Sequence, residues 1–321
     1  MDAHLPLHQH RFRAMGSQIV IWLQHTDADE ARDACTLAED LFAAAEQRMS
    51  RFLPHSELSQ LNARSGEWVT VSRLLWQVIS HALLLAQETG GLFDPTIGNA
   101  LLAGGYTASF SPTQRQLNGS DQANAEPLIG RWRQVELDPL RHAVRVPAGL
   151  RLDLGGIGKG YTAQMAVDLL ALWGPCLVDA GGDVVAGDGP AGQPGWLVGV
   201  AHPSEQDAET ALELWLNNAT LATSGIDYRW WWQNDRRQHH LIDPRTGQAA
   251  QTDLLTATVL AADGSEAEAW ATASLVMGRQ PSLTLAAEQH RALIVADETG
   301  VMQRSAAVEP FVAGRYVTRN S

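Results

Sequence analysis

The chain has 321 residues, enough for one large domain or two ordinary ones around a substantial core. Hydrophobic residues make up 45% of the sequence and charged residues 18%, which excludes an intrinsically disordered chain. The formal net charge of −13 argues against nucleic-acid or anionic-membrane partners, because both attract basic surfaces. Cys35 and Cys176 are too few for a disulfide scaffold or a cysteine-based zinc site. These limits favour a soluble globular protein, and among these an enzyme.

The N-terminal residues predict no export signal and no lipid anchor. Residues 1–13 lack an apolar run of the roughly seven residues that a signal-peptide core needs. No apolar run in the chain approaches the roughly 18 residues of a membrane span. We therefore expect a cytoplasmic protein without membrane insertion, whose residues 1–13 form a flexible arm. Metal binding by His4, His8 and His10 is the less favoured interpretation of that arm.

The first third of the chain predicts one strand and two long helices. Residues 17–24 are rich in apolar residues and predict a buried strand. Residues 27–49 carry apolar side chains at three- and four-residue steps, which is typical of an amphipathic helix. Ser72 is a good N-cap for a second helix that runs to Thr89, where two glycines provide the stop.

The remainder alternates short strands with helices. Residues 103–148 are of mixed polar composition, with strand-like segments at 133–137 and 143–146. Further along, we predict strands at 176–179, 196–200, 254–260 and 292–295, and helices after Gly160 and at 265–277. The sequence contains no internal repeat, low-complexity tract or flexible linker. The predicted fold is α/β (mixed α+β), a single domain over residues 14–321 with mixed sheets flanked by helices.

Two segments combine glycines with acids, at residues 153–160 and 179–183. Glycine allows the backbone to approach a bulky ligand closely, and amides at a helix start favour a phosphate. Residues 153–160 lead into a predicted helix, but their spacing is neither that of a P-loop nor that of a dinucleotide-binding fingerprint. A tight turn in a crowded core is the alternative interpretation.

Three other segments place polar side chains beside predicted strands and helix ends: residues 92–98, 223–228 and 239–247. Taken singly, each is more typical of a hydrogen-bonded turn than of a catalytic loop, and His240 alone is more typical of a core histidine. Together they supply the acids, imidazoles and hydroxyls that a phosphate-plus-metal site would use.

The last predicted helix carries Glu268 and Thr272 four residues apart, and therefore on one face. Magnesium prefers hard oxygen ligands, so this pair could hold the ion together with a backbone carbonyl and ligand phosphates. The alternative is an exposed acid and a buried threonine that bonds back to its own helix.

Residues 230–232 are consecutive tryptophans, and Arg236 and Arg237 follow them. Stacking on single-stranded nucleic acid would use such residues, but the acidic charge of the chain disfavours it. We favour a partly buried aromatic patch or a surface that docks a protein partner.

These segments, in this order, resemble the ApbE family of FAD:protein FMN transferases, over nearly the whole chain. The resemblance rests on eight blocks. They are residues 15–17 (MGS), 50–62 (SRFLPHSELSQLN), 93–98 (FDPTIG), 153–161 (DLGGIGKGY), 179–183 (DAGGD), 223–225 (TSG), 240–247 (HLIDPRTG) and 268–272 (EAWAT).

The resemblance implies one α/β domain that binds FAD and Mg²⁺. It also implies transfer of FMN to a Ser or Thr hydroxyl of an acceptor protein, with release of AMP. The residues that match the family's flavin-nucleotide contacts are Met15, Phe52, Leu92, Phe93, Asp94, Asp153, Lys159 and Ile242. The residues that match its metal ligands are Gly156 (through its carbonyl), Glu268 and Thr272. The candidate catalytic residues are His240 and, failing that, Asp183, and Thr223 looks like a further contact.

The chain departs from the family pattern at several positions. Glu268 stands where the family usually has Asp, which makes the side chain one methylene longer and predicts looser or different metal ligation. Phe52 stands where Tyr is familiar, and Ala271 cannot ligate where some members have an acid.

We expect Lys159 and the amides of residues 155–160 to hold the pyrophosphate, while His240 or Asp183 takes the hydroxyl proton. Two alternatives remain at this stage. One is an FAD pyrophosphatase that produces FMN and AMP, and the other is a non-catalytic FAD-binding protein.

Overall fold

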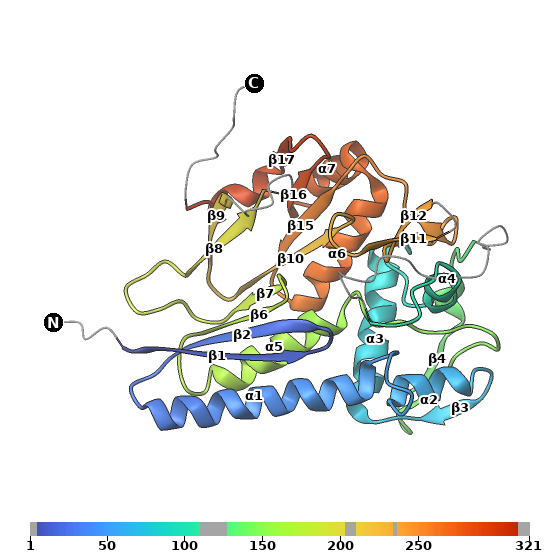
Figure 1. The fold of residues 1–321 in the computed structure, drawn as a ribbon, viewed down its shortest axis with the longest axis horizontal. Coiled ribbons are helices and arrows are strands. Elements are labelled where there is room, and N and C mark those ends of the chain that lie inside the picture. The colour runs from blue at the N-terminus through green and yellow to red at the C-terminus, as the bar shows by residue number, and fades with distance from the viewer. Residues whose placement is uncertain (1–4, 110–126, 203–209, 234–235, 314–321) are drawn as a thin grey trace.

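The computed structural model describes residues 5–109, 127–202, 210–233 and 236–313, and an antiparallel sheet forms its centre (Figure 1). The sheet has eight strands in the order β1-β2-β6-β7-β10-β15-β16-β17. Their bounds are β1 (Leu7–Ala14), β2 (Ser17–Gln24), β6 (Cys176–Ala180), β7 (Val184–Ala186), β10 (Ala219–Gly225), β15 (Thr256–Ala261), β16 (Ala292–Ala296) and β17 (Met302–Arg304).

Helices cover one face of this sheet. They are α1 (Ala28–Met49), α5 (Gly158–Leu170), α6 (Gly264–Met277) and α7 (Arg279–Glu288). The strands alternate, so that residues such as Ile19, Ile21 and Val178 point to this face and pack against the apolar sides of α1 and α5. Asp27 begins α1 by accepting hydrogen bonds from the amides of Asp29 and Glu30.

The opposite face is covered by a two-stranded hairpin and a short 3₁₀ helix. These are β8 (Trp196–Ala201), β9 (Thr210–Leu216) and η3 (Ala306–Phe311). Leu212, Leu214 and Leu216 of β9 pack with Leu177 and Ile294 of the sheet in a separate buried cluster. The sheet is therefore the middle of three layers.

A second group of elements packs beside the sheet and closes one side of the site. It comprises α2 (Glu57–Ala63), α3 (Arg73–Glu88), η2 (Arg131–Gln134) and the small sheet of β3 (Trp68–Thr70), β5 (Ala143–Arg145) and β4 (Glu136–Asp138). Their common core buries Leu61, Ile79 and Val144 together with Phe93 and Ile157. Because Phe93 and Ile157 belong to glycine- and acid-rich loops, this core fixes the loops that face the site.

The remaining elements lie at one end of the molecule. They are α4 (Gly98–Ala103), the hairpin of β11 (Trp230–Gln233) and β12 (Arg236–His239), and the pair β13 (Ile242–Asp243) and β14 (Gln248–Ala249) (Figure 1). Trp231 ties β11 to α4, since its indole nitrogen donates to the Gly104 carbonyl at 2.7 Å and its ring stacks on Tyr106.

The structure confirms the mixed α+β class, with every strand pair of the central sheet antiparallel. The predicted strand at 17–24 and the helix capped by Ser72 are present. The strand predicted at residues 133–137 is wrong in part, because Arg133 and Gln134 belong to η2. None of the helices among the described residues has the length and apolar character to cross a membrane.

The flexible arm predicted for residues 1–13 is wrong over residues 7–13, which form β1. Strand β1 pairs with β2 along its whole length, and Phe12 packs edge-on against Phe42 of α1. His10 bonds to the Glu39 carboxylate at 2.6 Å, and His8 bonds to the His25 carbonyl. These histidines therefore serve the packing of an edge strand, while His4 lies outside the described residues.

The tryptophan run provides a matched pair of substitutions. Trp231 is buried and hydrogen-bonded, whereas Trp232 is 43% exposed. We expect Trp231→Ala to lower the free energy of unfolding by about 3–5 kcal/mol, because it leaves a cavity and an unpaired carbonyl. Trp232→Ala is expected to cost about 1 kcal/mol or less. Urea denaturation measures both, and equal losses would contradict this account of the packing.

Candidate active site

One cavity of about 1110 Å³ collects every residue predicted for catalysis, nucleotide binding or metal binding. Its volume exceeds the roughly 300–1,000 Å³ of ordinary small-molecule pockets, which indicates a large ligand. Its wall is formed by two turns, β1–β2 and β6–β7, by the loops before α4 and α5, by the end of β10 and by α6. The predicted residues that line it are Met15, Phe52, Leu92, Phe93, Asp94, Asp153, Gly156, Lys159, Asp183, His240, Ile242, Glu268 and Thr272.

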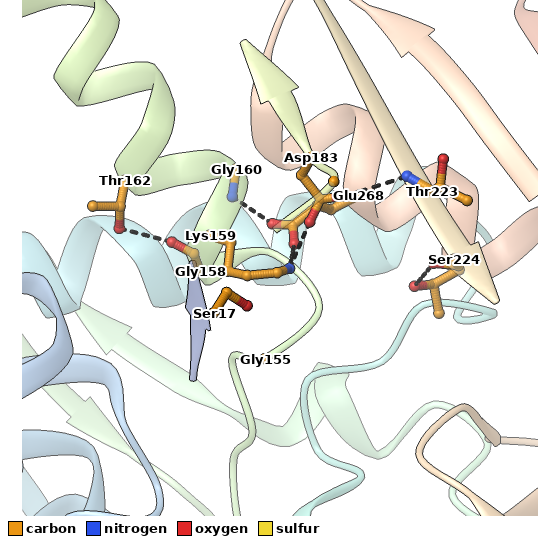
Figure 2. Close-up of polar contacts among 12 residues, drawn as sticks. Ser17, Gly155, Gly158, Lys159, Gly160, Thr162, Asp183, Thr223, Ser224 and Glu268 are labelled. Carbon is orange, nitrogen blue, oxygen red and sulfur yellow. Dashed lines mark hydrogen bonds and ion pairs between the residues drawn. The ribbon is translucent and has the colours of Figure 1, made fainter. Parts of the chain in front are cut away.

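The polar centre of the cavity is a lysine held between two carboxylates (Figure 2). Lys159 Nζ lies 2.6 Å from Asp183 Oδ2 and also contacts Glu268 Oε1. The second oxygen of each carboxylate is also hydrogen-bonded. The Thr223 amide donates to Asp183 Oδ1, and the Gly160 amide donates to Glu268 Oε2 at 2.7 Å. One positive charge therefore faces two negative charges, and the cluster carries a net charge of −1.

Burial and ion pairing shift the pKa values of Lys159 and Glu268 in opposite directions. Burial alone would lower the pKa of Lys159, but the charges of Asp183 and Glu268 outweigh it and raise that pKa. Burial raises the pKa of Glu268 to about 7; the Asp183 charge adds to this rise, and Lys159 opposes it. Lys159 is therefore an ammonium group at neutral pH, whereas Glu268 would gain from a further cation.

One close backbone approach builds this cluster, and it requires glycine. A Cβ on Gly160 would lie 2.3 Å from the Gly264 carbonyl oxygen and 2.9 Å from Glu268 Oε2. Gly160 therefore lets α5 meet α6 closely enough for its amide to reach the Glu268 carboxylate. A Cβ on Gly156 would lie 3.1 Å from the Phe93 ring, so the loop before α5 packs tightly against that ring.

A second ion pair forms another wall of the cavity. Arg51 Nε lies 2.5 Å from Asp153 Oδ2, and Arg51 Nη1 donates to the Tyr106 carbonyl at 2.8 Å. The guanidinium also lies over the rings of Phe52 and Tyr106, at 4.1 and 4.5 Å from their centroids. Phe52 and Asp153 are thus predicted binding residues that Arg51 holds in place.

Asp94 is buried at the cavity wall, and only one of its two carboxylate oxygens is hydrogen-bonded among the described residues. Oδ1 accepts hydrogen bonds from the Thr96 amide and hydroxyl, while Oδ2 has no hydrogen-bond partner among the described residues. Burial raises the pKa of Asp94. A buried acceptor without a donor is costly, so Asp94 is suited to bind an N–H or O–H group of a ligand.

His240 directly follows β12 and lines the same cavity. Its Nδ1 bonds to the Arg229 carbonyl at 3.4 Å, and since a carbonyl only accepts, Nδ1 carries the proton. This leaves Nε2 as an acceptor. Burial, followed by the charge of Arg229, lowers the pKa of His240 well below its usual value, so the ring is neutral at pH 7.

Comparisons with known proteins agree with this arrangement. The family model of the ApbE family matches residues 15–295. The chain belongs to the ApbE family. It is 32% identical over 271 residues to an FAD:protein FMN transferase of Treponema pallidum, covering 78% of this chain and 74% of that protein. A Salmonella typhimurium protein of the same name is 27% identical over 277 residues, covering 84% and 78%.

Solved structures of ApbE proteins share the fold. The crystal structure of the ApbE protein from Thermotoga maritima has a TM-score of 0.86 and 26% identity, covering 96% of this chain and all of that chain. The apo flavinyl transferase ApbE of Pseudomonas stutzeri has a TM-score of 0.81 and 21% identity, covering 97% and 98%. The second likeness is one of fold alone.

The donors predicted for Mg²⁺ in this ApbE family member fit that ion. Glu268 and Thr272 lie one turn apart in α6, and Thr272 Oγ1 lies 4.0 Å from where a Cβ on Gly156 would stand. The described residues include no cluster of three or more His, Cys, Asp or Glu side chains able to hold a metal. Magnesium commonly uses one or two carboxylates plus substrate phosphates, so one carboxylate, one hydroxyl and one carbonyl are a suitable set.

The phosphate-binding role expected of residues 155–160 meets an obstacle in the structure. The Gly155 amide already donates to Asp153, the Gly158 amide to the Leu154 carbonyl and the Gly160 amide to Glu268. Lys159 is paired with two carboxylates. The expectation is wrong for these three amides, because the loop uses them to hold its own fold, and a phosphate needs other donors.

Sequence reasoning did not single out several residues that line the cavity: Ser17, Arg51, Tyr106, Ser224 and Arg229. Ser224 bonds to Thr272 at 3.0 Å and so orients a predicted metal ligand. Arg51 and Ser224 do lie inside two of the blocks that resemble the family. Nothing in the sequence, however, distinguishes them from the neighbouring residues of those blocks that have only a structural role.

The Lys159 cluster predicts a large effect of a single substitution. Lys159→Met would leave two buried carboxylates without their cation, so we expect the free energy of unfolding to fall by about 3–5 kcal/mol at pH 8. Arg64→Met is the control, because it breaks an exposed pair with Glu67 and should cost at most about 1 kcal/mol. Urea denaturation tests both variants. A Lys159→Met protein as stable as wild type would show that the ammonium group is dispensable for folding.

Proposed function

We propose that this protein transfers the FMN half of FAD to a Ser or Thr hydroxyl of an acceptor protein, with Mg²⁺, and releases AMP. The observation that carries the proposal is the single cavity in which Lys159, Asp183, His240 and Glu268 converge beside apolar and aromatic side chains. Both curated relatives described above are FAD:protein FMN transferases, which supports the same activity here.

The reaction is a substitution at the phosphorus atom of the FMN half. The acceptor hydroxyl oxygen forms a bond to that phosphorus, and the bond from phosphorus to the bridging oxygen of the pyrophosphate breaks. The bridging oxygen and its electron pair leave with AMP, and the hydroxyl proton passes to a base of the protein. The pyrophosphate repels a nucleophile by its negative charge, so the site must supply positive charge and a fixed line of attack.

The geometry favours His240 over Asp183 as that base. Asp183 already accepts from Lys159 through one oxygen and from the Thr223 amide through the other. His240 instead is neutral, with Nε2 free to accept a proton while Nδ1 is held by the Arg229 carbonyl. A positioned neutral imidazole is the usual general base for a hydroxyl.

The remaining predicted residues would position FAD. Phe52, Leu92 and Phe93 offer apolar surface to the ring systems, and the free oxygen of Asp94 offers an acceptor to an N–H or O–H group. Gly156, Glu268 and Thr272 would hold Mg²⁺, which when bound neutralises pyrophosphate charge and stabilises the AMP leaving group. Lys159 fixes the two carboxylates next to that position.

The transferase is tested by mass spectrometry of a candidate acceptor that carries an exposed Ser or Thr, after incubation with the protein, FAD and Mg²⁺. We expect a mass gain of one FMN on that hydroxyl, together with AMP, and no gain in the presence of a chelator. Free FMN and AMP without any acceptor would instead support the pyrophosphatase. Bound FAD that stays intact with every acceptor would support a flavin-binding protein.

The pH dependence of transfer tests the role of His240. Because burial and Arg229 lower its pKa, the imidazole stays neutral as the pH falls through 6.5. At saturating Mg²⁺, which would keep Glu268 in its carboxylate form, kcat/KM should therefore hold its neutral-pH value there. We expect the decline only at lower pH, in a profile recorded from about pH 5 to 8. His240→Ala should lower the rate by about 10²–10⁴-fold. A midpoint at 6.5, or an unchanged rate in His240→Ala, would remove the histidine from this role.

A further inference from the structure

Arg229 is a partly buried cation of the cavity. It lies between β10 and β11, lines the cavity, and donates from Nη2 to the Ser17 hydroxyl at 3.4 Å. It forms no ion pair with any residue that the structure describes. By contrast, Lys159 is paired with Asp183 and Glu268, and Arg51 is paired with Asp153.

The Arg229 charge acts on the groups at the centre of the cavity. After burial, it is the largest influence that lowers the pKa of His240, and it also opposes the raised pKa of Lys159. The Arg229 carbonyl holds His240 Nδ1. Ser17, which Arg229 contacts, lines the same cavity as Lys159 and is drawn with it in Figure 2. Arg229 therefore lines the same cavity as both the proposed base and the acidic cluster.

Several other candidate phosphate donors are already engaged, and Arg51, whose Nη2 has no hydrogen-bond partner among the described residues, has its charge balanced by Asp153. The amides of Gly155, Gly158 and Gly160 donate within the protein, and Lys159 Nζ is held by two carboxylates. Even with Mg²⁺ beside Glu268, a dianionic pyrophosphate next to the net carboxylate charge of the Lys159 cluster would gain from a second cation. Arginine suits that place because its guanidinium is always charged and can give two parallel hydrogen bonds to phosphate oxygens.

We propose that Arg229 binds the pyrophosphate of FAD and stabilises the negative charge on the transferring phosphoryl group and its leaving oxygen; this role rests on the proposed function. Arg229 is then a catalytic residue that touches the transferring phosphoryl group. Fixed positive groups of this kind contribute most where charge develops during the reaction. The ligand chemistry that the residue recognises is a phosphate anion, not the flavin ring.

Binding of FAD and riboflavin to Arg229→Gln separates this role from a structural one, because riboflavin carries no phosphate. Flavin fluorescence titration should show FAD affinity reduced about 10–100-fold and riboflavin affinity unchanged. Arg73→Gln is the matched control, since Arg73 is an exposed arginine outside the cavity, and both affinities should stay at wild-type values. Equal losses for the two flavins, or no loss of FAD affinity, would overturn the proposal.

Transfer kinetics give the second readout. We expect Arg229→Gln to lower kcat by about 10²–10³-fold, and Arg229→Lys to recover part of that loss because it keeps the charge. A kcat equal to wild type in Arg229→Gln would overturn the catalytic part of the proposal. If wild type itself transfers no FMN, the proposed function fails, but the comparison of FAD with riboflavin still decides whether Arg229 binds phosphate.

Discussion

The contact between α5 and α6 at Gly160 and Gly264 is the constraint on which the site depends. Any side chain at either position would drive the two helices apart, since a Cβ would lie 2.3 Å from the opposing carbonyl oxygen. The close approach brings the start of α5 against the acidic side of α6, so that Gly160 donates to Glu268 and Lys159 reaches the same carboxylate. A packing requirement between two helices thus becomes the geometry of a charged centre.

The protein's own groups hold that centre in place. Lys159, Asp183 and Glu268 are each held by at least two partners, and Arg51 and Asp153 form a second fixed pair on another wall. Charges locked in this way need little rearrangement when charge develops in a reaction, which is the main source of electrostatic catalysis. The arrangement separates two tasks. Lys159 and Arg51 are paired with carboxylates and hold them in place, whereas Arg229 has no ion-pair partner among the described residues and faces the cavity.

Much of the fold and of the site composition was predictable, because local patterns carried them. Helices α1 and α3 have apolar periodicity, and α1, α3 and α6 all begin at capping residues. The family blocks contain every predicted residue that the cavity gathers except Leu92, which directly precedes one of them. Strand β1 was missed because its partly buried positions include His8 and His10, which hide the period of two. The pairing of Lys159 with Glu268 was not predictable, since it depends on an approach of helices 109 residues apart in sequence.

The packing of α5 against α6 explains how the longer side chain of Glu268 is held. The sequence alone suggested that one extra methylene, compared with the family's usual Asp, would loosen metal ligation. In the structure the longer side chain spans the distance from α6 to the Gly160 amide, and that hydrogen bond at 2.7 Å fixes one oxygen of its carboxylate. Lys159 contacts the other oxygen. The carboxylate is therefore restrained at both ends, and the additional methylene gives it reach toward α5 without the freedom that an unanchored side chain would have.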